Sequence, residues 1–349
     1  MKVLSRRRMV LVNGLLLLLL FISFVGSTLL GPVSINLSEA ILGLFSGGPH
    51  TDILFRARLP RVLLGLAVGG GLASASLVLQ ALLRNPLACA HILGVSGGAS
   101  LGGILGLIVF PHLFLSTNQQ LIGEISWVPL SSFIGALCSM SLIYRLSLVH
   151  GRLHPYHLLL CGVIFNAFVS AIIMFLNSVL DFYQAQNLLF WLMGSLSTRS
   201  YLTVAFIWGY VLVGCLWLWR HGVSLNLISL GEEGAMQLGI DVDRTQKQLF
   251  VASSFVVGAI VSVSGMIGFV GLMVPHVMRL LLGNDHRLLF PASFLAGGIF
   301  LSWADTLART LYAPAELPVG VITAFLGGPF FFFLLYRESR KNILHEPSR

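Results

Sequence analysis

Asp305 is the most chemically distinctive residue of this chain, because it is an acid inside an otherwise apolar stretch. It lies four residues before Arg309, a spacing that brings two side chains together on one face of a helix. A carboxylate within a membrane-spanning segment either pairs with a cation or relays protons. The spacing favours a buried Asp305–Arg309 ion pair, and a proton relay in a proton-coupled carrier is the alternative.

One serine lies in a setting that suits a nucleophile. The run Gly94-Val95-Ser96-Gly97-Gly98 matches the nucleophile turn of hydrolases and the Gly-x-Ser-Gly of intramembrane serine proteases. A hydrolase elbow needs a soluble α/β sheet, which the sequence does not predict. A membrane protease needs a helical histidine, and nothing in the sequence places the candidate, His276, beside Ser96. We therefore assign no catalytic residue and keep proteolysis as an alternative.

Two common kinds of site are missing from the sequence. The ten histidines form no His-Glu-x-x-His pair and the four cysteines are scattered, so we predict no metal site. No Gly-x-x-x-x-Gly-Lys-Ser/Thr loop occurs, so the chain has no nucleotide site of that type. We expect no cofactor, and ATP, if it drives this protein, must bind to a partner chain.

The elements that carry these residues are membrane helices. Hydrophobic residues make up 56% of the 349 residues and charged residues only 10%, far below the ~25% of soluble domains. A spanning helix needs about 20 apolar residues. The sequence predicts an all-α, polytopic membrane protein of about ten transmembrane helices in a single domain over 1–349. The expected spans are 9–30, 59–83, 92–110, 127–146, 158–180, 201–219, 249–271, 272–283, 288–312 and 317–336.

Charge placement sets the topology and the number of spans. With ten spans and both termini cytoplasmic, 16 of the 21 Lys and Arg residues lie inside and five lie outside. A single span over 249–283 would move the basic C-terminus outside, so we place a break at Gly265–Pro275, where the chain turns back. The basic start followed by the long apolar run to Leu30 predicts a retained first helix rather than a signal peptide.

Arg58, Arg61 and Arg309 fall on the outer side in this topology, against the usual bias. They either snorkel to headgroups or form a cationic platform for an acidic extracytoplasmic partner. In the third span, glycines recur every four residues and form one face that admits a neighbouring helix closely; these are Gly94, Gly98, Gly102 and Gly106.

Residues 220–248 form the longest cytoplasmic loop. Ser229 and Glu232 have the spacing of a capping box, so we expect Ser229 to begin a short amphipathic helix that Gly239 ends. Such a helix lies on the bilayer or binds a partner protein.

Several runs in order resemble the FecCD family, the ten-helix permeases of ATP-binding-cassette (ABC) importers for iron–siderophores, haem and vitamin B12. The resemblance covers the chain from about residue 50 onward. The runs are Arg58-Leu59-Pro60-Arg61, Arg84-Asn85-Pro86-Leu87-Ala88, Leu93–Ala99, Leu230-Gly231-Glu232, Gly268–His276, Asp285-His286-Arg287, Ala304-Asp305, Glu316–Gly320 and Gly327-Gly328-Pro329-Phe330.

The resemblance implies an assembly and a set of roles. It implies a homodimer, two ABC ATPase subunits inside, a substrate-binding protein outside and a metal-chelate substrate. It implies a cytoplasmic coupling helix that includes Leu230, Gly231, Glu232, Glu233, Ala235, Leu238 and Gly239. It assigns Arg58, Arg61 and Arg309 to docking of the binding protein, and Asn85, Pro86 and Leu87 to the gate. The opposing gate segment, with His154 and Pro155, departs from the small hydroxyl residues of relatives.

The sequence therefore predicts a permease subunit of a binding-protein-dependent importer in a bacterial inner membrane, without an enzyme activity of its own. The expected cargo is an iron(III)–siderophore or related iron chelate. Vitamin B12 or haem is the alternative cargo. A proton-coupled carrier and an intramembrane protease are the alternatives from other classes.

Overall fold

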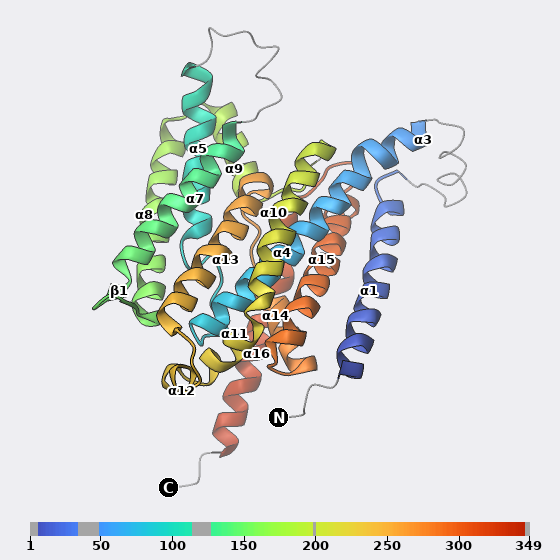
Figure 1. Ribbon diagram of the computed structural model, residues 1–349. Coiled ribbons are helices and arrows are strands. Elements are labelled where there is room, and N and C mark those ends of the chain that lie inside the picture. The colour runs from blue at the N-terminus through green and yellow to red at the C-terminus, as the bar shows by residue number, and fades with distance from the viewer. Residues whose placement is uncertain (1–5, 34–48, 114–126, 198–199, 346–349) are drawn as a thin grey trace.

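The computed structural model describes residues 6–33, 49–113, 127–197 and 200–345, and most of them are helical. Figure 1 shows a bundle of long, roughly aligned helices. Its long helices are α1 (Arg6–Leu29), α4 (Leu59–Leu82), α5 (Val95–Leu113), α7 (Trp127–Leu146), α8 (Pro155–Val179), α10 (Tyr201–Arg220), α13 (Val242–Ser264), α14 (Val270–Leu282), α15 (His286–Thr310) and α16 (Val319–His345).

The ten predicted spans correspond one to one with these helices, so the predicted all-α class is confirmed. In the described ranges, seven helices are long and apolar enough to cross a membrane, and the apolar parts of α5, α14 and α16 are shorter. The remaining elements are α3 (Pro49–Asp52), a π-helical turn η1 (Ile53–Arg58), a hairpin of β1 (Leu148–Val149) and β2 (Arg152–Leu153), α9 (Phe182–Leu192), α11 (Gly222–Leu230) and α12 (Glu232–Gln237).

Helix α4 is the core of the bundle, and almost every residue from Pro60 to Leu82 is buried. It packs against α15, α13, α14, α10 and α1. Close approach is possible because small residues face each other: an added Cβ on Gly69 would overlap the Gly297 carbonyl of α15, and one on Gly297 would overlap the Gly69 carbonyl. By contrast, α1 lies at the edge of the bundle and buries little of its length.

The break between the seventh and eighth spans lies within the predicted Gly265–Pro275 but is shorter, so the seventh helix ends before residue 271. Helix α13 ends at Ser264, and α14 begins at Val270 and includes Pro275. Gly265 (φ +66°) and Phe269 (φ +65°) are left-handed and redirect the chain. This irregular backbone is held by protein, since the Ser195 amide donates to the Ser264 carbonyl at 2.8 Å. Non-helical backbone within the hydrocarbon region of a membrane requires protein partners of this kind.

The glycine face of α5 meets α7. An added Cβ on Gly98 or Gly102 would overlap α7 backbone near Gly135, and one on Gly106 would overlap the Ser131 side chain. Gly94 lies just before α5 with φ +78°. The two helices therefore approach backbone to backbone, as small residues allow in membranes.

We predict that Gly102→Ala lowers the free energy of unfolding by about 1–3 kcal/mol, because α5 and α7 must separate to admit the methyl group. The measurement is thermal unfolding of the purified chain in detergent. Gly14→Ala in α1 is the matched control, since no atom lies within 4 Å of its added Cβ. Equal unfolding temperatures for Gly102→Ala and the wild type would contradict the close packing.

Candidate functional site: a coupling helix and a buried arginine cluster

A short helix, α12, protrudes at one end of the bundle (Figure 1). Its Ala235 is buried and packs with Ile228 of α11 and Val242 of α13. Leu230 and Leu238, on either side of the helix, are 75% and 67% exposed. Gly239 (φ +84°) follows its last turn. The helix is thus fixed by one apolar side chain, and it presents two leucines outward.

The start of α12 differs from the expected capping box. The Ser229 hydroxyl donates to the Leu225 carbonyl within α11, 2.7 Å away, so Ser229 does not cap α12. Gly231, with φ +151°, precedes the helix instead. The sequence placed the start too early because α11 continues to Leu230, and only a glycine accepts the backbone conformation of the turn between the two helices.

Glu232 at the start of α12 is joined to the segment that carries Asn85. Its Oε1 lies 3.2 Å from Arg84 Nη2 and accepts a hydrogen bond from Gln246 Nε2 at 3.2 Å. Arg84 Nε also donates to the Ile228 carbonyl at 3.2 Å. Arg84 therefore connects α12 and the end of α11 to the chain that follows α4. Sequence reasoning did not assign this role to Arg84, because its partner lies 148 positions away.

The predicted gate residues occupy two places at this end. Asn85 Oδ1 accepts from the Leu87 amide at 2.9 Å, which closes a tight turn at Pro86, and Leu87 is 45% exposed. His154 precedes α8 and Pro155 is its first residue, after the β1–β2 hairpin. Across the described ranges no hydrogen bond or ion pair joins these two segments. The hairpin is instead linked to α13, through Arg152 Nε and Asp243 Oδ2 at 3.4 Å.

Asp285 and Asn226 hold α11 against the start of α15. Asp285 Oδ1 accepts from the Arg287 amide at 3.0 Å and from Asn226 Nδ2 at 2.9 Å. Asn226 Oδ1 accepts from the His286 amide at 2.8 Å. The Arg287 guanidinium donates to both Asp285 oxygens, at 3.1 and 2.8 Å. These hydrogen bonds lower the pKa of the Asp285 carboxyl to about 2, and the bonds from the Arg287 side chain make the largest contribution.

This carboxylate stabilises the fold above the unfolded-state pKa of about 3.9, and the contribution is lost as the pH falls toward 2. Asp285 is the N-cap of α15, and Asp285→Asn keeps a side-chain oxygen that can accept from the Arg287 amide but removes the charge. We predict that the wild type is more stable than Asp285→Asn by about 1 kcal/mol at pH 6, after screening by solvent, and that the difference disappears near pH 2. Thermal unfolding of both proteins across this range measures it, and a difference independent of pH would exclude the carboxylate as its source.

At the other end of the bundle, four charged side chains from α4, α15 and the segment before α16 form the Arg61 cluster: Arg61, Asp305, Arg309 and Glu316. Asp305 Oδ1 lies 2.9 Å from Arg61 Nη2, and Asp305 Oδ2 lies 3.0 Å from Arg309 Nε. Glu316 Oε2 lies 2.7 Å from Arg61 Nη1. Asp305 therefore bridges two arginines, each less than a tenth exposed.

The predicted Asp305–Arg309 pair is present, and Arg61 and Glu316 are partners that local spacing did not reveal. All three arginines assigned to docking are buried in this conformation. Arg58 donates to the Leu29 carbonyl at 2.6 Å, and Arg309 Nη2 donates to the Ser27 carbonyl at 3.1 Å, so both anchor the end of α1. Docking on these arginines stays a prediction.

The protease alternative gains no support from the site. Ser96 is buried in the first turn of α5, which packs on α7 and α13. His276 lies on α14, where its ring contacts Phe330 and Phe331 of α16.

A bundle of apolar helices with a buried charge cluster at one end and a protruding helix at the other is the architecture expected of a membrane permease. The chain belongs to the FecCD transport family, whose model matches residues 16–337. It is therefore a permease of the ABC importer type, a class of transporter subunit rather than of enzyme.

Three curated relatives illustrate the family. The haemin transport permease HmuU of Yersinia pestis is 39% identical over 329 residues, which cover 94% of this chain and 96% of HmuU. The cobalamin import permease BtuC of Halobacterium salinarum is 41% identical, over 83% of this chain and 75% of BtuC. A probable siderophore permease of Bacillus subtilis, YfhA, is 35% identical over 84% of each chain.

A solved structure of a proposed metal-chelate type ABC transporter in an inward-facing conformation has the same fold. It superposes with a TM-score of 0.78 at 31% identity, over 93% of this chain and 98% of that one.

Proposed function

We propose that the chain, as a single transmembrane domain over 1–349, is the permease of an ATP-driven, binding-protein-dependent importer of iron chelates in a bacterial inner membrane. Two copies enclose the pathway, two ABC ATPases bind at the α12 end, and a substrate-binding protein docks at the Arg61 end. Both termini are then cytoplasmic. ATP is bound by the ATPases, and the permease itself uses no cofactor.

The observation that carries this proposal is the link from α12 to the Asn85 turn. The exposed leucines beside α12 suit the groove of a partner protein, and Glu232 and Arg84 connect the helix to the turn. Closure of the ATPase dimer on ATP pulls α12, and Arg84 passes this displacement to Asn85, Pro86 and Leu87 at the pathway mouth. ATP shifts the equilibrium between outward-open and inward-open states only through its different affinity for the two.

The proposal also names the class of molecule that is transported. The relatives are named for haemin, cobalamin and siderophores, which are all large metal chelates. We favour an iron(III)–siderophore, with haem and vitamin B12 as the alternatives. A proton-coupled carrier is less well supported, because Asp305 is buried between two guanidinium groups and is held as a counter-ion.

The test is uptake by proteoliposomes that contain the permease, its ATPase and its binding protein. We expect ATP-dependent uptake of an iron–siderophore, with haemin and cobalamin as competitors that identify the cargo. Transport driven by an ion gradient, with the permease alone, would overturn the proposal.

The Arg84–Glu232 link is tested in the same vesicles. Both side chains are partly exposed, so Arg84→Ala and Glu232→Ala should each change stability by less than about 1 kcal/mol. We expect both variants to retain the ATPase but to lose most ATP-driven uptake, because the displacement of α12 no longer reaches the turn. Arg220→Ala, which removes an exposed charge at the end of α10, is the control and should transport normally. Normal uptake by both link variants would show that coupling follows another route.

A further inference from the structure

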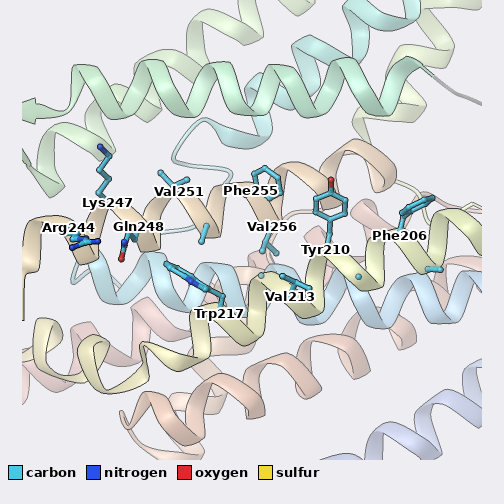
Figure 2. A pocket seen from close by; sticks show the side chains of 14 residues that line it. Phe206, Tyr210, Val213, Trp217, Arg244, Lys247, Gln248, Val251, Phe255 and Val256 are labelled. Atoms are coloured by element: carbon cyan, nitrogen blue, oxygen red, sulfur yellow. The ribbon is translucent and has the colours of Figure 1, made fainter.

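An open groove of about 950 Å³ lies between α10 and α13, and neither the coupling helix nor the Arg61 cluster uses it. Figure 2 shows aromatic and aliphatic side chains along its length, with Phe206 toward one end and Arg244 and Lys247 at the other. Its walls are almost entirely apolar and include Phe206, Gly209, Tyr210, Val213, Phe255 and Val256.

The polar side chains gather at the end of the groove nearest α12. Arg244 and Lys247 lie in the first turns of α13, next to Gln248 and opposite Trp217 of α10. Within the part of the chain that the structure describes, neither cationic side chain has an ion pair or hydrogen bond. The neighbouring acids are engaged elsewhere, since Asp243 pairs with Arg152 and Asp241 accepts from the Arg244 backbone amide. The groove thus combines an apolar wall with two unpaired cations.

The length of the groove matches one leaflet of a bilayer. From Arg244 to Val256 the helix rises about 18 Å, at about 1.5 Å per residue. Half of the hydrocarbon core of a bilayer is about 15 Å thick. An acyl chain that follows α13 from the two cations therefore reaches the middle of the membrane near Phe255, and its headgroup lies at the interface.

We propose that this groove is a binding site for one anionic phospholipid of the leaflet on the α12 side. The phosphate lies between Arg244 and Lys247, and an acyl chain lies over Val213, Tyr210 and Phe206. The Trp217 ring sits at the glycerol level, where tryptophan is favoured at membrane interfaces. In the orientation of the proposed function this is the cytoplasmic leaflet, and the site itself does not depend on transport.

A second copy of this chain fits the groove less well. Each copy has a formal net charge of +8, and a symmetric contact here would bury two unpaired cations on each side. A lipid phosphate supplies the missing negative charge without that cost.

The experiment measures lipid binding to the full-length chain in detergent by native mass spectrometry. The probes are phosphatidylglycerol and phosphatidylcholine with the same acyl chains. We expect phosphatidylglycerol to bind about 25-fold more tightly, since each of two interfacial cations contributes about a factor of five. Arg244→Ala with Lys247→Ala should remove this preference. Arg145→Ala, an exposed arginine outside the groove at the end of α7, should keep it.

A second variant tests the apolar wall without disturbing the fold. The added Cβ of Gly209 meets no atom within 4 Å, so Gly209→Leu extends its side chain into the groove and should reduce binding of both lipids at least tenfold. Gly14→Leu in α1, equally open but remote, is the matched control. Equal affinity of the wild type for the two lipids would overturn the proposal. So would unchanged binding by Gly209→Leu, or a groove variant that changes the oligomeric state instead of lipid binding. These assays need no ATPase or binding protein, so their failure would leave the proposed function intact.

Discussion

Asp305→Asn is expected to lower the free energy of unfolding by about 3–5 kcal/mol, a large effect for one neutralised charge. The substitution leaves Arg61 and Arg309 buried near each other, with only Glu316 to balance them. Both guanidinium groups are desolvated by the fold. Without the shared carboxylate, their desolvation free energy is no longer offset by an ion pair. Thermal and denaturant unfolding of the purified chain in detergent measures the loss.

Two further variants separate this explanation from a general effect of mutation in α15. Glu316→Gln removes a carboxylate that is half exposed, so its cost should stay below about 1 kcal/mol. Asp305→Asn combined with Arg309→Gln should recover much of the lost stability, because one unpaired cation is removed with the acid. An Asp305→Asn protein as stable as the wild type would show that Asp305 is not the counter-ion of the cluster.

Leu230→Glu together with Leu238→Glu is expected to abolish ATP-driven transport. These two leucines are the most exposed apolar side chains beside α12, and in the proposed assembly they enter a groove of the ATPase. Burying a carboxylate there costs at least about 2 kcal/mol, which weakens the contact about thirtyfold or more. Co-purification of the permease with its ATPase, and ATPase activity in the complex, measure the loss.

The fold should be unchanged in this double variant, because Ala235 and not the two leucines holds α12 in place. An unfolding temperature equal to that of the wild type checks this. Leu311→Glu is the matched control: Leu311 is 68% exposed but lies at the opposite end of the bundle, so the variant should retain the ATPase. If the double variant still bound the ATPase normally, the contact would lie elsewhere.

The helices were predictable from sequence because hydropathy is a local property. Each apolar run became one helix, and the four-residue spacing of Asp305 and Arg309 predicted their pair correctly. Arg61 could not be assigned to the same cluster, because its partner is 244 positions away and only the packing of α4 on α15 joins them. The Arg84–Glu232 link was missed for the same reason.

The sequence-based predictions of helix ends were wrong where one sequence pattern allowed two interpretations. Ser229 has the spacing of a helix cap, but α11 continues through it and its hydroxyl bonds back to Leu225. The break after α13 was predicted to extend to Pro275, because proline usually interrupts a helix, whereas it ends at Phe269. Proline is tolerated within α14, and the left-handed residues Gly265 and Phe269 redirect the chain instead.

The separation of Arg61 from Asp305 also has a consequence for how the protein is made. At about 5–20 residues per second, the ribosome needs about 12–50 s to add the 244 residues between them. Once α4 has left the ribosome and entered the membrane, its guanidinium waits for a carboxylate that has not yet been synthesised. The nascent chain must therefore keep this arginine hydrated, or shielded by the insertion machinery, until α15 arrives.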